Sequence, residues 1–272
     1  MNLLEANKTL GVIGCGTMGE AIVRGILHSG NLAPAQIFAS DARSEVAANL
    51  ANKYGIRAGT DNLAVAMACD LALVAVKPYQ LSAVLDNDAM RVALKGKLVI
   101  SIAAGVRLEK LSGFLPKSAL IRAMPNTPAL IGEGMTGLAR GKGTGEEQMT
   151  QALALFASVG KSLEVDEAHM DIVTALAGSG PAFVFVMIDA LADGAVKLGL
   201  RRDAAVAMAA QMVQGAARMV LQTGTHPAVL KDQVTTPGGC TIAGLGVMEE
   251  GKLRSVLART VEETARVAGK LG

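Results

Sequence analysis

The stretch Leu10–Gly19, LGVIGCGTMG, decides the fold that we expect for this chain. A short apolar run leads into a GxGxxG pattern, and an amphipathic helical pattern follows it. Glycines at these positions permit a tight turn and let the backbone approach a pyrophosphate closely at a helix N-terminus. GxGxxG alone is a weak signal, but the strand before it and the helix after it predict a dinucleotide-binding turn. Its residues are Gly14, Cys15, Gly16, Thr17, Met18 and Gly19.

Short apolar runs continue on the C-terminal side of this turn and alternate with helical patterns. Runs such as Leu71–Val76 are apolar throughout, which is typical of parallel strands covered on both faces. The pattern predicts an α/β fold with a Rossmann-like, doubly wound sheet. A surface turn is expected at 139–147, and no strand after Val165. The predicted strands are 10–14, 36–40, 71–76, 98–102 and 119–124.

From Met170 onward the pattern is helical. The segment Ala182–Ile188 is apolar on every side of its helix, which implies full burial, and about 100 residues in one subunit cannot cover it. We therefore expect a second copy of the chain, that is, a homodimer. The predicted domains are residues 1–166, which bind the dinucleotide, and residues 167–272, an all-α substrate and dimerisation domain. The predicted helices are 181–198, 203–223, 241–250 and 252–271.

Composition excludes several classes of function. The chain has 272 residues, 26 basic and 24 acidic side chains and 3% aromatic residues, so it offers no face for nucleic acid. Its longest apolar stretches, 98–106 and 182–188, are shorter than a membrane span, and the first eight residues do not have the pattern of a signal peptide. Three widely spaced cysteines predict neither disulfides nor a metal site. We expect a cytoplasmic protein that binds no membrane.

The chain shows no motif for a proton donor. His28, His169 and His226 lie in no catalytic pattern. Hydride transfer to a carbonyl needs such a donor, whereas an imine brings its own protonatable nitrogen. The absence of a motif therefore favours an imine as the substrate.

The end of the second predicted strand bears on the choice of cofactor. It has the sequence ASDAR, in which Asp41 suits the ribose hydroxyls of NADH. Ser40 and Arg43 suit the 2'-phosphate of NADPH instead. The choice between NADPH and NADH depends on which of these side chains faces the ribose. We predict NADPH, with NADH as an alternative.

A second glycine-rich turn precedes the helix that is predicted to start at Thr241. Backbone N–H groups of Gly238, Gly239 and Cys240 and the positive end of the helix dipole would converge there on an anion. The hydroxyls of Thr236 and Thr241 flank them. This pattern predicts a carboxylate-binding nest, although such a turn by itself is more often an ordinary helix cap.

Four further segments identify a family when they are taken together with the first turn. They are SIAAGV at 101–106, RAMPNTP at 122–128, TALAGSGP at 174–181 and LKDQVTTPGGCTIAGL at 230–245. From about residue 9 to the last helix, the chain resembles pyrroline-5-carboxylate reductase. The departures are small: Ala175 and Ala177 replace a frequent Gly and Ser, and Cys240 stands where Thr or Ala is common.

The resemblance implies a reaction, an assembly and a set of residue roles. The reaction is reduction of 1-pyrroline-5-carboxylate to L-proline by NAD(P)H, the last step of proline biosynthesis, and the assembly is a homodimer within a decameric ring of dimers. Thr174 and Ser179 would be catalytic, with Glu167 and the loop from Thr236 to Thr241 at the substrate. Cofactor contacts would come from Ser40 and Asn62 at the adenosine side, and from Ala75, Val76, Lys77, Pro78, Ile102, Ala103 and Ala104 toward the nicotinamide.

Asn126 lies between Pro125 and Pro128 in a rigid turn after a predicted strand. We predict that its amide lies at a cofactor edge and count Asn126 among the cofactor-binding residues, with a purely structural role in the turn as the alternative.

Two other functions remain open. A β-hydroxyacid dehydrogenase shares the GxGxMG start, but Val184 stands where that family has its lysine, and Met187 and Ile188 stand where it has its amide. A cofactor-binding redox sensor without turnover would leave the nest at Gly238–Thr241 unexplained.

Overall fold

The computed structural model describes residues 8–271. It divides into two compact units, Met1–Ser179 with Glu263–Gly272, and Gly180–Glu262. The whole sheet lies in the first unit, and the second is helical. The boundary predicted after residue 166 lies before this division and stays a prediction. The sequence predicts no signal peptide in residues 1–8. Of these residues the structure describes Lys8 alone, so this prediction lies outside the described residues.

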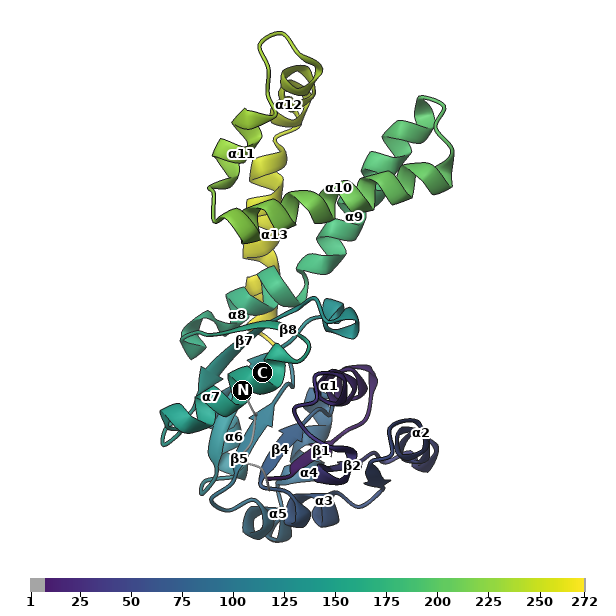
Figure 1. Ribbon diagram of the computed structural model, residues 1–272. Helices are drawn as coiled ribbons and strands as arrows, with labels where there is room; N and C mark the ends of the chain where they lie inside the picture. Colours follow the sequence, from purple (N-terminus) through teal and green to yellow (C-terminus); the bar gives the residue numbers. More distant parts are fainter. Residues whose placement is uncertain (1–7, 272) are drawn as a thin grey trace. The chain divides into compact units, whose positions relative to one another are not determined.

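An eight-stranded sheet forms the centre of the first unit (Figure 1). Its order is β3-β2-β1-β4-β5-β6-β7-β8, parallel from β3 to β6, with β7 antiparallel to β6 and β8 parallel to β7. The first six strands have the order of a Rossmann fold, so the predicted fold class is confirmed. The strands are β1 Leu10–Ile13, β2 Ile37–Ser40, β3 Arg57–Gly59, β4 Leu71–Val74, β5 Leu98–Ser101, β6 Ala119–Met124, β7 Gly134–Arg140 and β8 Gly160–Glu164.

Helices cover both faces of this sheet. One buried apolar cluster joins the strands to Ile22 and Ile26 of α1 and Phe156 of α7, and the other joins them to Leu85 of α4 and Leu111 of α6. With both faces covered, the central strands must be apolar throughout, which is the pattern that the sequence shows. The helices of this layer are α1 Thr17–His28, α2 Ser44–Tyr54, α3 Asn62–Ala68, α4 Leu81–Leu85, α5 Asp88–Ala93, α6 Leu108–Phe114 and α7 Glu146–Ala157.

Side-chain caps fix where two of these helices begin. Asp61 accepts hydrogen bonds from the N–H groups of Leu63 and Ala64 at the start of α3. Asn87 accepts one from Met90 at the start of α5. These oxygens satisfy backbone donors that the first turn of a helix leaves without an internal partner.

The strands β3, β7 and β8 were not among those predicted from the sequence. β3 has three residues and β8 is an exposed edge strand, so neither carries an apolar run. β7 contains Gly134 and Gly137, which usually weaken a strand, but an added Cβ on Gly137 would lie 2.6 Å from Val173. These glycines permit close packing, which no sequence pattern reveals. β7 also shortens the turn predicted at 139–147, because it runs to Arg140 and α7 begins at Glu146.

A short helical stretch follows β8 and leads into the second unit. It consists of α8, Met170–Val173, and a π-helical turn, Thr174–Gly178. The predicted helices are present with slightly shifted ends, and α11 is an additional one. The helices are α9 Gly180–Lys197, α10 Arg202–Thr223, α11 Pro227–Gln233, α12 Cys240–Glu250 and α13 Leu253–Ala268.

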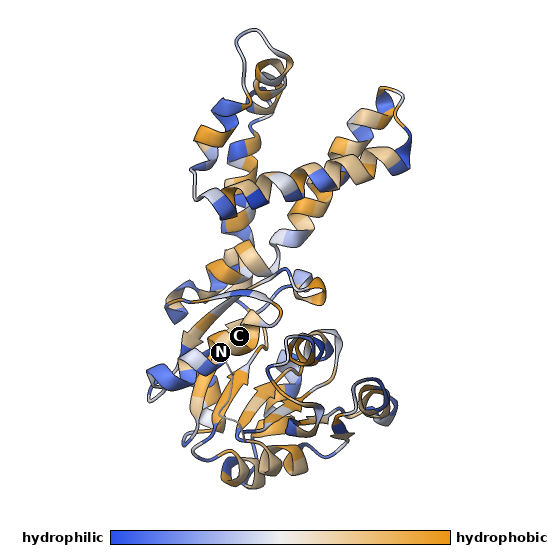
Figure 2. Cartoon of the chain, in the orientation of Figure 1, coloured by the Kyte–Doolittle hydropathy of each residue, from blue (hydrophilic) through white to orange (hydrophobic). Residues whose placement is uncertain are grey.

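The helical unit exposes much of its apolar surface. α9 and α10 pack along each other, yet Phe185 and Val186 are 62% and 70% exposed, and Figure 2 shows hydrophobic colour along both helices. Within residues 8–271, two helical stretches are long and apolar enough to cross a membrane, Glu167–Lys197 and Arg202–Thr223. The sequence analysis considered only short apolar stretches and missed these two, so its criterion was too narrow.

Candidate active site

The first glycine-rich turn is shaped by its neighbours. Gly14 has a φ of 98°, and a Cβ there would lie 2.8 Å from the backbone carbonyl carbon of Ala75. A Cβ on Gly19 would overlap the carbonyl oxygen of Gly14. At Gly16, in contrast, a Cβ would meet nothing within 4 Å. The turn is therefore closed on the protein side and open at Gly16, which fits the approach of a pyrophosphate to the N-terminus of α1.

Asp41, which directly follows β2, stabilises this turn by hydrogen bonding. Its carboxylate accepts the N–H of Cys15 at 3.0 Å, and the N–H and Nε–H of Arg43 at 3.0 and 3.1 Å. Burial alone would raise the pKa of Asp41, but the bonds from Arg43 and Cys15 outweigh it and hold the pKa below its ordinary value. Asp41 is thus an ionised group whose two oxygens already have partners.

Cys15 is a buried structural residue. Its thiol donates to the carbonyl of Ser40, and burial, followed by the charges of Asp41 and Glu20, raises its pKa to about 12. A thiol with that pKa is not a nucleophile at neutral pH.

A cavity of about 420 Å³ lies beside the turn, at the ends of β2 and β4. The Ser40 hydroxyl donates to Asn62 Oδ1 at 2.7 Å at its wall, which joins the two residues predicted for the adenosine side. Tyr79 and Gln80 also line it and were missed. Their position just after a strand end, where ligands of α/β sheets gather, was the available signal. The predicted residues that line this cavity are Gly14, Gly16, Ser40, Asn62, Ala75, Val76 and Lys77.

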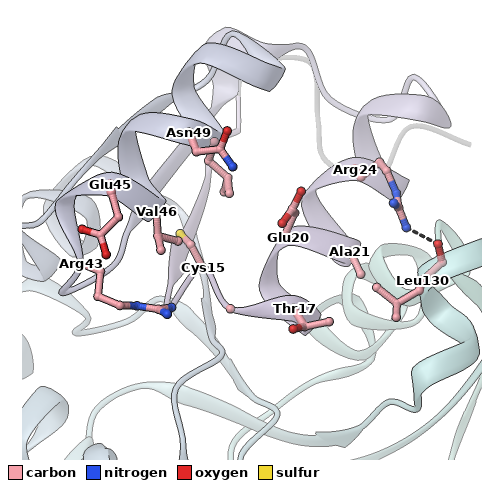
Figure 3. Close-up of a pocket in the computed structure, with 12 residues that line it drawn as sticks. Cys15, Thr17, Glu20, Ala21, Arg24, Arg43, Glu45, Val46, Asn49 and Leu130 are labelled. Carbon is pink, nitrogen blue, oxygen red and sulfur yellow. Dashed lines mark hydrogen bonds between the residues drawn. The ribbon is translucent and has the colours of Figure 1, made fainter.

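A second cavity, of about 600 Å³, lies between α1 and α2 (Figure 3). Cys15, Gly16 and Thr17 line it, and Arg43 lines both cavities. The Arg43 side chain is 60% exposed, so it can reorient toward a ligand in either one. On the opposite wall Arg24 donates to the carbonyl oxygen of Leu130, which joins α1 to the turn after β6.

The other predicted cofactor residues line neither cavity. Met18 packs against the core, and Pro78 opens a 3₁₀ turn that ends at Gln80. Ile102 follows β5 and donates its N–H to Val74, and Ala103 is buried beside it. Ile102, Ala103 and Ala104 keep their predicted role toward the nicotinamide as a proposal only.

The two predicted catalytic residues lie at one π-helical turn. The Thr174 hydroxyl donates to the carbonyl of Met170 at 2.8 Å, and the Ser179 N–H donates to the carbonyl of Thr174 at 2.9 Å. Asn126 reaches the same turn, because its Nδ2 donates to the carbonyl of Ala177 at 3.0 Å. π-helical turns occur frequently at functional sites.

Glu167 takes part in a cluster of charges at the end of β6. Its carboxylate accepts the N–H of Leu108, which starts α6, at 2.6 Å and lies 3.8 Å from the buried guanidinium of Arg122. Arg122 also pairs with Asp171 at 3.3 Å. The contacts described for Glu167 are therefore structural, and its predicted position at the substrate ring stays a prediction.

The second glycine-rich turn lies in the helical unit and is open. Gly238 has a φ of 67°, and Gly239 precedes α12, which begins one residue before the predicted start. Among residues 8–271 no side-chain cap of this helix is found, and its first turn contains no acidic residue. The N–H of Gly239, which the sequence assigned to the anion, instead donates to the carbonyl of Thr236 at 3.1 Å. One of the predicted donors is thus engaged within the loop, and the role of the Gly238 and Cys240 N–H groups stays a prediction.

Fold and site together define a dinucleotide-dependent oxidoreductase with a helical second part. Residues 9–105 match a family model described as NADP oxidoreductase coenzyme F420-dependent, and residues 167–271 match one described as pyrroline-5-carboxylate reductase dimerisation.

Individual relatives cover nearly the whole chain. A pyrroline-5-carboxylate reductase from Methanosarcina acetivorans is 43% identical over 267 residues, which are 98% of each chain. A solved reductase of the same name from Coxiella burnetii superposes with a TM-score of 0.93 at 33% identity, over 97% of this chain and 98% of that one. A Plasmodium falciparum pyrroline carboxylate reductase with NADP bound gives 0.87 at 30% identity, over 98% of each. The chain belongs to the pyrroline-5-carboxylate reductase family.

Family membership bears on one alternative that the sequence left open and on one of its predictions. It excludes the β-hydroxyacid dehydrogenase alternative. It also identifies residues 167–271 as a dimerisation region, so the exposed apolar side chains of α9 and α10 have a protein partner to cover them. The predicted NAD(P)H cofactor is likewise confirmed at that level.

Proposed function

We propose that this chain reduces 1-pyrroline-5-carboxylate to L-proline with NAD(P)H, the last step of proline biosynthesis. One observation carries the proposal: a relative that covers 98% of the chain is a pyrroline carboxylate reductase with NADP bound, and the glycine turn for that dinucleotide is intact and open at Gly16. The nicotinamide supplies the hydride. The residues of the chain itself have to bind and orient the substrate and the dinucleotide and hold the protons of the substrate in place.

The turn Gly14–Gly19 binds the pyrophosphate through the first N–H groups of α1. Ser40 and Asn62 lie on the wall of the adjoining cavity and bind the adenosine half. NADPH is preferred, because the carboxylate of Asp41 is already bound to Cys15 and Arg43. The Arg43 guanidinium also pairs with Asp41, but it is exposed and can reach a 2'-phosphate as well.

The substrate carboxylate binds at the start of α12. The backbone N–H groups of Cys240 and Thr241 have no side-chain cap there, and the Thr241 hydroxyl adds one more donor. No acidic side chain of that first turn competes with the anion. Thr236 and Gly238 shape the loop that precedes these donors.

Thr174 and Ser179 bind the ring nitrogen. Because the Thr174 hydroxyl gives its proton to Met170, its oxygen is left as an acceptor, which suits the N–H of a protonated imine. The hydride adds to the carbon of the C=N bond, and the nitrogen keeps its proton as the amine of proline. This reaction needs no histidine or lysine acid, and catalysis is positioning together with electrostatic stabilisation.

The active assembly is a homodimer, and rings of five dimers are the larger form that we expect. Support comes from the apolar surface of α9 and α10 and from the dimerisation model over residues 167–271. The reaction takes place in the cytoplasm, in keeping with three free cysteines and small, water-soluble reactants.

The test is a spectrophotometric assay with purified protein. NADPH and NADH are each mixed with 1-pyrroline-5-carboxylate, and consumption of the reduced cofactor and formation of proline are followed together. Equal amounts of both changes support the proposal. Cofactor binding without turnover would instead identify a sensor. Light scattering at micromolar concentration tests the assembly, and a folded, active monomer would contradict it.

A further inference from the structure

The carbonyl group of Ala177 cannot be satisfied in the usual helical way. In an α-helix the carbonyl of residue i accepts from the N–H of residue i+4, and residue 181 is proline, which has no N–H. The chain forms a π-helical turn at this point, in which the N–H of Ser179 bonds to the carbonyl of Thr174 five residues earlier. The sequence therefore leaves one acceptor of this turn without its α-helical donor.

Asn126 supplies the missing donor. Its Nδ2 lies 3.0 Å from the carbonyl oxygen of Ala177, and its Oδ1 accepts the N–H of Met135 in β7 at 2.9 Å. The residue is 8% exposed, so these bonds lie away from water. One carboxamide thus connects the sheet to the π-helical turn through both of its ends.

The turn is also packed closely against the end of β6. A Cβ on Gly178 would lie 2.7 Å from Cε of Met124. Asn126 follows β6 by two residues, so the same end of the strand holds the turn by packing and by hydrogen bonding. Loss of the hydrogen bond from the Asn126 amide would leave the turn held by packing alone. The hydroxyl groups at the two ends of the turn would then change their spacing.

We propose that Asn126 is a positioning residue that fixes the π-helical turn carrying Thr174 and Ser179, and is not a cofactor contact. The catalytic consequence rests on the proposed function, whereas the effect on the turn does not. The structure assigns both polar atoms of the side chain to protein partners. The turn takes this shape because Pro181 removes an N–H and Asn126 replaces it.

The first experiment compares Asn126→Asp with Asn87→Asp. Aspartate keeps the acceptor for Met135 but brings no N–H to Ala177. Asn87 is a matched control, because its amide also donates to a carbonyl, that of Val84, and accepts an N–H, that of Met90. We expect Asn126→Asp to lower kcat about tenfold or more, while the Kd of NADPH and all constants of the control stay within about twofold. Weakened NADPH binding with kcat retained would overturn the proposal in favour of a cofactor contact.

The second experiment restores the missing donor. Pro181→Ala gives residue 181 an N–H, so the carbonyl of Ala177 no longer depends on Asn126. We expect Asn126→Asp to lower Tm less in the Pro181→Ala background than in the parent. If Asn126→Asp alone does not fold, the double variant should fold. Equal losses in both backgrounds, or a double variant as unfolded as the single one, would overturn the proposal.

The third experiment separates this proposal from the proposed function. Hydrogen exchange of the Ser179 N–H reports on the turn without any turnover. It should rise several-fold in Asn126→Asp and stay unchanged in Asn87→Asp. If that holds while the parent reduces no 1-pyrroline-5-carboxylate, the proposed function fails and the positioning role stands. Unchanged exchange in an active enzyme would overturn the positioning role alone.

Discussion

The chain contains two glycine-rich turns that each open a helix, Gly14–Gly19 before α1 and Gly238–Gly239 before α12. Both offer backbone N–H groups to an anion. In the first, Gly14 lies against the backbone of Ala75 and Gly19 against that of Gly14, and the carboxylate of Asp41 accepts an N–H of the turn. In the second, the glycines meet open space or the side chain and carbonyl of Thr236, within the same loop.

The difference shows how similar chemistry is held in place by different means. The first turn is rigid because a covered sheet packs on it, so its shape depends on many long-range contacts. The second depends on its local backbone, in a unit whose apolar side chains remain exposed until a partner covers them. Substitutions should therefore affect stability and cofactor binding at the first turn, and substrate binding at the second.

The largest expected effect comes from the same change made in both turns. Gly19→Ala places a methyl group against the backbone oxygen of Gly14, which cannot move without distorting β1. We expect a loss of about 1–3 kcal/mol in unfolding free energy and a comparable loss in NADPH affinity. Gly239→Ala meets the Oγ1 of Thr236, an exposed side chain that can rotate. The Tm of Gly239→Ala should change little. Equal losses of Tm in the two variants, measured by thermal denaturation, would contradict the difference between the two turns.

Thr241→Ala should affect the substrate alone. It removes one hydroxyl donor at the start of α12, and we expect kcat/KM for the imine to fall by about 1.5–3 kcal/mol. NADPH affinity, measured by fluorescence titration, should stay within about twofold. Unchanged imine kinetics with weakened NADPH binding would move this turn to the cofactor and the substrate to Thr174 and Ser179.

Asp41→Asn tests the preference for NADPH over NADH. The amide oxygen can still accept the N–H of Cys15, but the charge that pairs with Arg43 is gone. Arg43 is then free for a 2'-phosphate, and the ratio of kcat/KM values for NADPH over NADH should rise, by about tenfold at most. Arg43→Gln in the same assay should lower the ratio. An unchanged ratio in both variants would remove this pair from cofactor recognition.

The same variant predicts a dependence of stability on pH. The pKa of Asp41 is lower in the folded chain than its ordinary value of 3.8, so its bonds stabilise the fold at every pH above that value. That stabilisation is lost as the pH falls through the folded pKa. Acid unfolding should therefore separate the parent from Asp41→Asn at neutral pH and bring them together once the pH has fallen below the folded pKa. A constant difference in unfolding free energy across that range would contradict this.

The smallest effect is expected at Thr136 in β7. Among the described residues, its hydroxyl is the buried side-chain group without a hydrogen-bond partner. Thr136→Val keeps the shape and removes that group, so unfolding free energy should stay equal or rise by less than about 1 kcal/mol. Chemical denaturation measures this, and a clear loss of stability would show that the hydroxyl has a partner in solution.

The sequence predicted the class of the fold because its signals are local. The apolar strands, the glycines before α1 and the helical periodicity each depend on neighbours a few residues away. The strands β3, β7 and β8 were not predicted, because their place in the sheet depends on pairing with distant segments. One example is β7, which pairs antiparallel with β6. The same limit applied to the nest, where the N–H of Gly239 is taken by Thr236.

By itself the sequence determined the dinucleotide turn, the family and the need for a partner along α9. It could state that Asp41, Arg43 and Asn126 are polar groups near a cofactor, but not which way they point. Tertiary structure decided that Asp41 binds Cys15 and that Asn126 binds the π-helical turn. A hydrogen bond depends on the spacing of atoms that the fold alone brings within about 3 Å of one another.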